Sequence, residues 1–141
     1  MGKYTVAGHI TRFFWLPRGT ERHRPTSYAR MTGIWLTSIA VGTAVTVAGG
    51  DEEYGGADIM TVIVVLNVID DIITGVRHRW PAALAAVVLL YGGSRLAEAL
   101  LSDSLDPVWA RTVAAGVGVT LALAATASIT RLPQRLAMTV R

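Results

Sequence analysis

Two adjacent aspartates, Asp70 and Asp71, stand inside the apolar stretch "LNVIDDIITGVRHRW", residues 66–80. Paired carboxylates can share a proton, bind a cation or attract a base. If this stretch is a helix, Asn67, Asp71 and Thr74 share one face, and Asp70 lies about 100° round from Asp71. Two ionised carboxylates repel each other in an apolar environment. We therefore expect that a base lies close to them or that one of them stays protonated.

A second polar cluster, formed by Arg95 and Glu98, lies in the next apolar stretch, where a spacing of three residues allows the two side chains to pair. Ionisable residues within membrane helices usually face the bundle interior or water, and they often serve function. These charges lie within two or three turns of an interface, which favours structural pairing; an ion or proton pathway is the alternative. The candidate polar residues are Asn67, Asp70, Asp71, Arg95 and Glu98.

The composition indicates a membrane protein. Hydrophobic residues make up 52% of the chain and charged residues 16%, whereas ordinary soluble domains carry about 25% charged residues. The chain has no cysteine, which excludes disulfides, thiolate metal sites and a cysteine nucleophile.

Four apolar segments approach the length of about 20 residues that crosses a bilayer, and short loops connect them. Short loops force neighbouring helices to run antiparallel, so the sequence predicts an all-α, integral membrane, up-down four-helix bundle. The predicted spans are residues 31–50, 58–76, 81–101 and 107–130, which together form one transmembrane domain, residues 31–130.

The distribution of arginine predicts the orientation of the spans. Basic residues concentrate in residues 1–30, in the loop at 77–79 and in the tail at 131–141, whereas the other two loops are acidic. Because cytoplasmic flanks collect Lys and Arg, we expect an inner-membrane, multi-pass protein with both termini in the cytoplasm. Tyr28 and Trp80 then fall at the inner boundary, where amphipathic rings are favoured.

The N-terminal segment, residues 1–30, contains "VAGHITRFFWLPRG", in which Val6, Ile10 and Phe13 recur at helical spacing beside Arg12. This pattern predicts a short amphipathic helix that lies in the cytoplasmic interface and ends at Pro17. The arginines that follow are expected next to a membrane, so we do not expect nucleic acid as a partner.

Small residues recur every fourth position in two of the predicted spans. Such stripes allow helix backbones to approach closely, which stabilises packing inside one chain or between copies of it. The candidate packing residues are Ser38, Gly42 and Thr46 in the first span and Thr112, Gly116, Thr120, Ala124 and Ser128 in the fourth.

The sequence offers no catalytic, cofactor-binding or metal-ligating set, so we do not expect an enzyme. All three histidines, His9, His23 and His78, fall outside the predicted spans, which leaves no axial pair for haem in the bundle. The chain also lacks a Glu-x-x-His pair for a di-metal bundle and a Gly-rich phosphate loop followed by Lys.

The small size, the small-residue helix faces and the basic tail "RLPQRLAMTVR" resemble the architecture of small four-span phage holins of actinobacterial type. The resemblance implies self-association in the lipid bilayer, as a homo-oligomer, and membrane permeabilisation; it assigns no functional residue. Two alternatives stay open. One is a non-catalytic accessory or assembly subunit of a larger membrane protein complex, and the other is a small channel or transporter subunit.

The predicted orientation has a direct test. Topology reporters fused after Tyr54 and after Ser104 should both report placement outside the cytoplasm, because both positions lie in the acidic loops. A fusion after Arg79 serves as the control and should report the cytoplasm. Cytoplasmic signals at positions 54 and 104 would contradict the orientation.

Overall fold

The computed structural model describes residues 26–49, 55–73 and 80–139, with the backbone alone at 71–73 and 131–139. The predicted all-α class is confirmed, because this part of the chain contains helices and no strand. The helices are α2 (Tyr28–Val47), α3 (Gly56–Ile73), α4 (Trp80–Leu101) and α5 (Pro107–Thr139). The predicted interfacial helix before Pro17 lies outside the described residues.

Local sequence signals explain where several helices begin and end. The Ser27 hydroxyl accepts a hydrogen bond from the Arg30 amide at 3.2 Å and caps α2. The Asp106 carboxylate caps α5 by accepting from the Val108 amide at 3.1 Å, and Pro107 needs no donor at its position. After α2, Gly49 adopts a φ of 75°, which residues with a Cβ rarely adopt.

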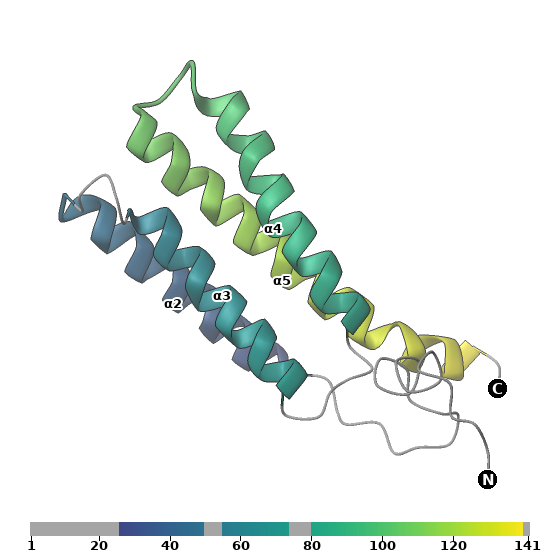
Figure 1. Cartoon of the computed structure of the whole chain (residues 1–141). Helices are drawn as coiled ribbons and strands as arrows, with labels where there is room; N and C mark the ends of the chain where they lie inside the picture. The colour runs from purple at the N-terminus through teal and green to yellow at the C-terminus, as the bar shows by residue number, and fades with distance from the viewer. Residues whose placement is uncertain (1–25, 50–54, 74–79, 140–141) are drawn as a thin grey trace, which may run out of the picture.

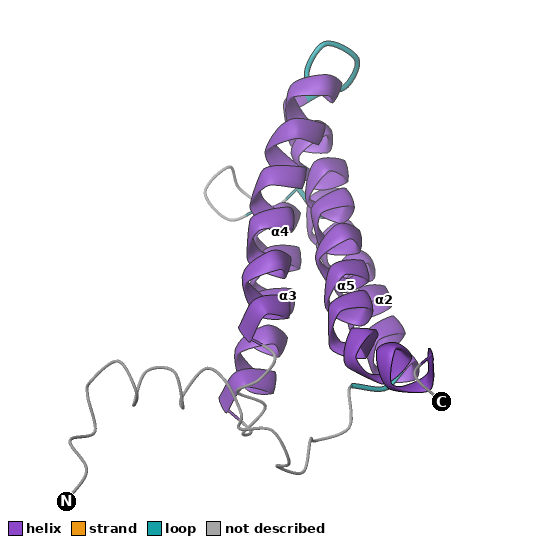
Figure 2. Ribbon diagram, turned by 90° about the vertical axis from the view of Figure 1, so that its right-hand side faces the viewer, coloured by secondary structure: helices purple, strands orange, loops and turns teal. Residues whose placement is uncertain are grey.

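The helices form two antiparallel hairpins, α2 with α3 and α4 with α5 (Figures 1 and 2). Helix α5 is the central element, because it packs along α4 and also contacts both α2 and α3. Helix α4 packs mainly on α5, and only 11% of its most apolar stretch is buried, against 44% for α5. The turn between α4 and α5 extends beyond the end of the other hairpin (Figure 1).

A run of small side chains brings α4 and α5 together. A Cβ added to Gly118 would collide with the Ser94 hydroxyl and would lie 2.5 Å from the Leu90 carbonyl oxygen, so no side chain fits at this crossing. The buried residues of α5 that recur at every fourth position are Ala110, Ala114, Gly118, Ala122 and Thr126. This second stripe was not recognised in the sequence, although its residues are just as small and as regularly spaced.

The α2–α3 hairpin is held by the predicted small residues of α2. Ser38, Gly42 and Thr46 are buried, and the Ser38 hydroxyl donates to the Met60 carbonyl oxygen at 3.2 Å. A Cβ on Gly42 would lie 2.8 Å from the Gly56 carbonyl oxygen. Close backbone approach therefore stabilises both hairpins.

The predicted stripe on α5 is buried over only half its length. Thr112 is buried and Gly116 half-buried against α2, whereas Thr120, Ala124 and Ser128 are exposed. A step of four residues advances about 40° beyond a full helical turn, so a stripe with this spacing winds around the helix. The stripe therefore begins at the contact with α2 and leaves it before the helix ends.

Helix α5 continues past the predicted span and includes residues 131–139 of the expected tail. Pro133 lies within this extension, where it removes one backbone hydrogen-bond donor. The C-terminal part of the helix changes direction (Figure 1). A helix interrupted at proline commonly bends in this way.

Two helices of the described chain are long and apolar enough to cross a membrane, Trp80–Leu101 and the Pro107–Thr130 part of α5. Helix α3 carries three aspartates, Asp58, Asp70 and Asp71, within 18 residues, and α2 is rich in threonine. A membrane placement of α2 and α3 therefore remains a prediction.

The α4–α5 crossing generates a prediction about glycine. Gly118→Ala should lower the free energy of unfolding by about 1–3 kcal/mol, because its methyl group would force the two backbones apart. Gly116→Ala is the matched control, since its Cβ would meet only the mobile Ile39 Cδ1, at 3.3 Å. The stability of both variants can be measured by thermal unfolding in detergent, with circular dichroism as the signal. Equal shifts in the melting temperature would show that the crossing is not critical.

Candidate functional site

The open end of the α2–α3 hairpin, away from its connecting loop, holds an ion pair between Arg30 and Asp70. Arg30 lies in the first turn of α2 and Asp70 in the last turn of α3, and the guanidinium Nη2 lies 3.1 Å from the carboxylate Oδ2. Both side chains are about half exposed. The base that the sequence analysis sought for the aspartate pair therefore comes from the segment that precedes the first predicted span. The side chain of Asp71 lies outside the described residues.

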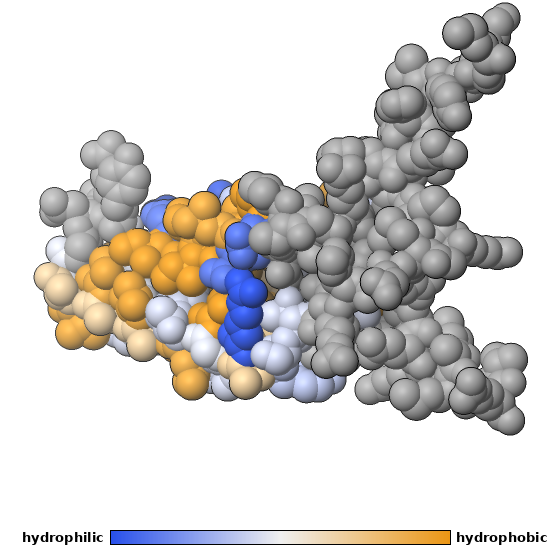
Figure 3. Space-filling view, turned by 90° about the horizontal axis from the view of Figure 1, so that it is seen from below, coloured by the Kyte–Doolittle hydropathy of each residue, from blue (hydrophilic) through white to orange (hydrophobic). Residues whose placement is uncertain are grey.

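Figure 3 shows a strip of strongly hydrophilic atoms that crosses an otherwise apolar and weakly polar face.

Asn67 lies one turn before Asp70 and donates to the Ile63 carbonyl oxygen of its own helix at 2.8 Å. That bond satisfies part of the amide without a partner from another helix, which reduces the cost of placing it among apolar residues.

A shallow groove opens beside Arg30 and Asn67, between α2, α3 and α5. About 310 Å³ of space lies within the outline of the groove, and this figure includes space that is open to the surroundings. Its other lining residues are mostly apolar and include Ile34, Val68 and Leu123. Its polar lining consists of Arg30, Asn67 and the two threonines Thr26 and Thr126, and its lining residues include no carboxylate.

A second charged cluster lies near the turn that joins α4 to α5, where Glu98 bridges two arginines. Its carboxylate lies 3.5 Å from Arg95 on the same helix and 3.2 Å from Arg111 on α5. Glu98 is 29% exposed, while Arg95 is 83% exposed and is held by this single contact across one turn. The spacing of Arg95 and Glu98 in the sequence predicted their pairing but not the contribution of Arg111.

The register of the α4–α5 hairpin was the signal that could have identified Arg111. A short turn connects the two helices, so residues at similar distances before and after it lie side by side. Glu98 and Arg111 occupy such positions, thirteen residues apart. Arg111 was the only base near the acidic loops, which made it the one available cross-helix partner.

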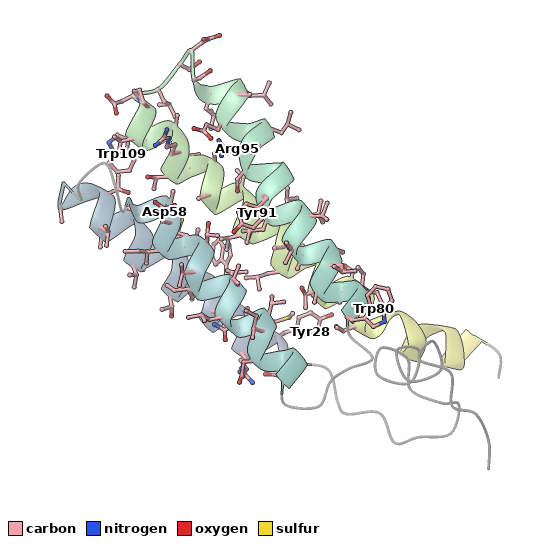
Figure 4. All side chains as sticks on the ribbon, viewed as in Figure 1. Tyr28, Asp58, Trp80, Tyr91, Arg95 and Trp109 are labelled. Atoms are coloured by element: carbon pink, nitrogen blue, oxygen red, sulfur yellow. The ribbon has the colours of Figure 1, made fainter. Side chains whose placement is uncertain are left out.

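The two charged clusters lie at opposite ends of the bundle. Arg95 lies towards the end that carries the α4–α5 turn, whereas Tyr28 and Trp80 lie towards the other end (Figure 4). The Arg30–Asp70 pair belongs to that other end, since Arg30 is two residues from Tyr28 in α2. The structure therefore does not bring the candidate polar residues into one site.

The buried polar residues of the described chain all carry hydroxyl groups. They are Ser38, Thr46, Thr112 and Thr126. The Thr46 and Thr112 hydroxyl oxygens lie 2.8 Å apart and join α2 to α5. Each of them also lies within bonding distance of a carbonyl of its own helix, so neither requires an ion or a water molecule. Within the described residues, no charged side chain lines an interior passage, and no three possible metal ligands come together.

The Arg30–Asp70 pair generates a prediction that a double-mutant cycle can test. Arg30→Gln and Asp70→Asn should each reduce stability, and their coupling energy should be about 0.2–1 kcal/mol, as for partly exposed ion pairs. Asp103→Asn, in the turn after α4, is the control and should leave stability unchanged. Additive effects of the two substitutions would mean that the pair does not anchor the helix ends.

Comparison with known protein families, with curated proteins and with solved structures finds no match to this chain.

Proposed function

We propose that this chain is an inner-membrane protein with four spans, and that it acts by self-association to permeabilise the membrane. The observation that carries the membrane placement is the character of its exterior. All four helices direct large apolar side chains outward, among them Leu36, Val41, Val62, Leu66, Leu84, Val88, Val113 and Val117. Soluble monomers rarely expose contiguous apolar surface of this extent, whereas lipid solvates it.

The interior supports the same placement. Most buried residues of α2, α4 and α5 are Ala, Gly, Ser or Thr, with Leu90 and Val119 among the larger ones. Lipid tails are as apolar as leucine, so helices in a bilayer associate through close packing and hydrogen bonds rather than by burying large side chains. Small side chains inside and large apolar ones outside suit that environment.

Helices α2 and α3 are included among the spans for two reasons. Both helices expose large apolar side chains, and the charge on Asp70 is balanced by Arg30 at the end of the hairpin. Hydroxyls along the bundle bond to carbonyls of their own helix, as Thr61 does to the Ala57 carbonyl oxygen at 3.0 Å. Such bonds lower the cost of placing threonine in lipid.

Self-association is supported by two features of the described surface, namely its paired charges and the uncovered surface of α4. The cluster at Glu98 and the pair at Arg30 are satisfied ion pairs rather than reactive groups. Helix α4 leaves most of its surface uncovered by the rest of the chain, which makes it available to another copy. A protein with these features acts through its helix faces, and assembly in the membrane is the action that we propose.

Controlled expression in a bacterial host tests this function. We expect an abrupt loss of membrane potential after a lag, and release of a co-expressed wall-degrading enzyme to its substrate. Gly118→Leu should abolish the effect, because the branched side chain separates α4 from α5. Gly33→Leu is the matched control, since a Cβ there meets nothing within 4 Å.

Two outcomes would contradict permeabilisation. One is an unchanged membrane potential when the protein is confirmed in the membrane. The other is stable co-purification with a defined membrane complex without any leak, which would favour the accessory-subunit alternative.

A further inference from the structure

Two charged side chains bound the apolar surface of α3, and they lie close together along the helix. Asp58 is in the first turn of α3 and Asp70 is near its end, and both are exposed. At about 1.5 Å per residue, the distance between them along the helix is about 18 Å. The residues between them carry no charge, so the apolar band on α3 is no taller than that.

Neighbouring helices repeat both limits. At the inner limit, Arg30 of α2 pairs with Asp70 at 3.1 Å. At the outer limit, Arg95 of α4 lies at a similar level to Asp58 along the long axis of the bundle (Figure 4), and its side chain is 83% exposed. Three helices therefore contribute to these two charged limits.

The band is much thinner than the hydrocarbon core of a typical bilayer, which is about 30 Å. Lysine and arginine can extend a long apolar stem towards water, but aspartate has a single methylene group and cannot. Asp70 pairs with Arg30, and Asp58 accepts a hydrogen bond from the Gly55 amide, but both residues remain exposed. In the four-span placement, water or lipid headgroups must therefore reach both carboxylates at their own positions on the helix. The central helix α5 differs, because it carries no charge over residues 112–130, a length of about 28 Å.

We propose that the chain thins the bilayer locally along its α2–α3 hairpin, and that the lipid surface it fits there has short acyl chains. The proposal rests on the four-span placement and adds the means by which the membrane is weakened. A span shorter than the bilayer is accommodated by thinning of the lipid around it. A thinner apolar layer is easier for ions and water to cross, so neighbouring copies would weaken a continuous patch.

X-ray scattering from stacked phosphatidylcholine bilayers with eighteen-carbon chains measures this effect as the phosphate-to-phosphate distance. The full-length chain should shorten that distance as the protein-to-lipid ratio rises. Asp58→Leu/Arg95→Leu removes the outer limit without changing the net charge and should reduce the shortening. Asp103→Leu/Arg135→Leu is the matched control, because it makes the same replacements in the turn after α4 and in the C-terminal extension of α5, and it should thin the bilayer as the parent does.

A second measurement separates fit to the lipid from a general loss of stability. The melting temperature of the parent should be highest in bilayers with fourteen-carbon chains and fall with increasing chain length. The optimum for Asp58→Leu/Arg95→Leu should move to longer chains. A variant that merely unfolds would instead lose stability at every chain length, which would contradict the proposal.

Oriented circular dichroism on the same samples distinguishes the two possible failures. Helices that cross the bilayer while its thickness stays unchanged would overturn local thinning and leave the four-span placement intact. The same holds if the double variant thins the bilayer as strongly as the parent, because the charged limits would then have no effect. Helices that lie flat on the surface would overturn both the thinning and the four-span placement.

Discussion

The structure depends on the close approach of helix backbones at glycine. At Gly118 the backbone of α5 lies so near the Leu90 carbonyl of α4 that even a methyl group would have to displace one of them. Gly42 and Gly56 form a similar crossing between α2 and α3. Burial of large apolar side chains drives the association of helices in water, but it contributes little between helices already surrounded by lipid. Close contacts and the hydrogen bonds between helices must supply the stability there.

The central position of α5 follows from this requirement. One face of α5 packs on α4 through alanine and glycine, while Thr112 and Gly116 face α2. The Thr46–Thr112 contact and the bond from the Trp35 indole to the Thr120 hydroxyl, at 2.9 Å, then connect the two hairpins. Helix α4 is left with a single neighbour for most of its length, which explains why so much of its apolar surface remains uncovered.

The charged side chains of the described residues lie near the ends of the helices. Arg30 and Asp70 join α2 to α3 at one end of the bundle, and Glu98 joins α4 to α5 near the other end. Pairing reduces the cost of placing charged groups beside apolar surface. Under the four-span placement that we propose, the same residues link the stability of the helix ends to the thickness of membrane that the protein fits.

The sequence by itself determined the helical class, the positions of the turns and the location of charge near helix ends. These features depend on local patterns, namely apolar run length, capping residues such as Ser27 and Asp106, and the clustering of arginine. The tertiary structure decided which side chains meet. On α5, the stripe that contains Gly118 and the stripe that contains Gly116 are equally regular in sequence, and only the position of α4 selects the first for the closest contact. Likewise, two residues forty positions apart became an ion pair because α2 and α3 run antiparallel, and the α4–α5 register placed Arg111 beside Glu98. Such pairings depend on which helices are neighbours, and the period of a single helix carries no information about its neighbour.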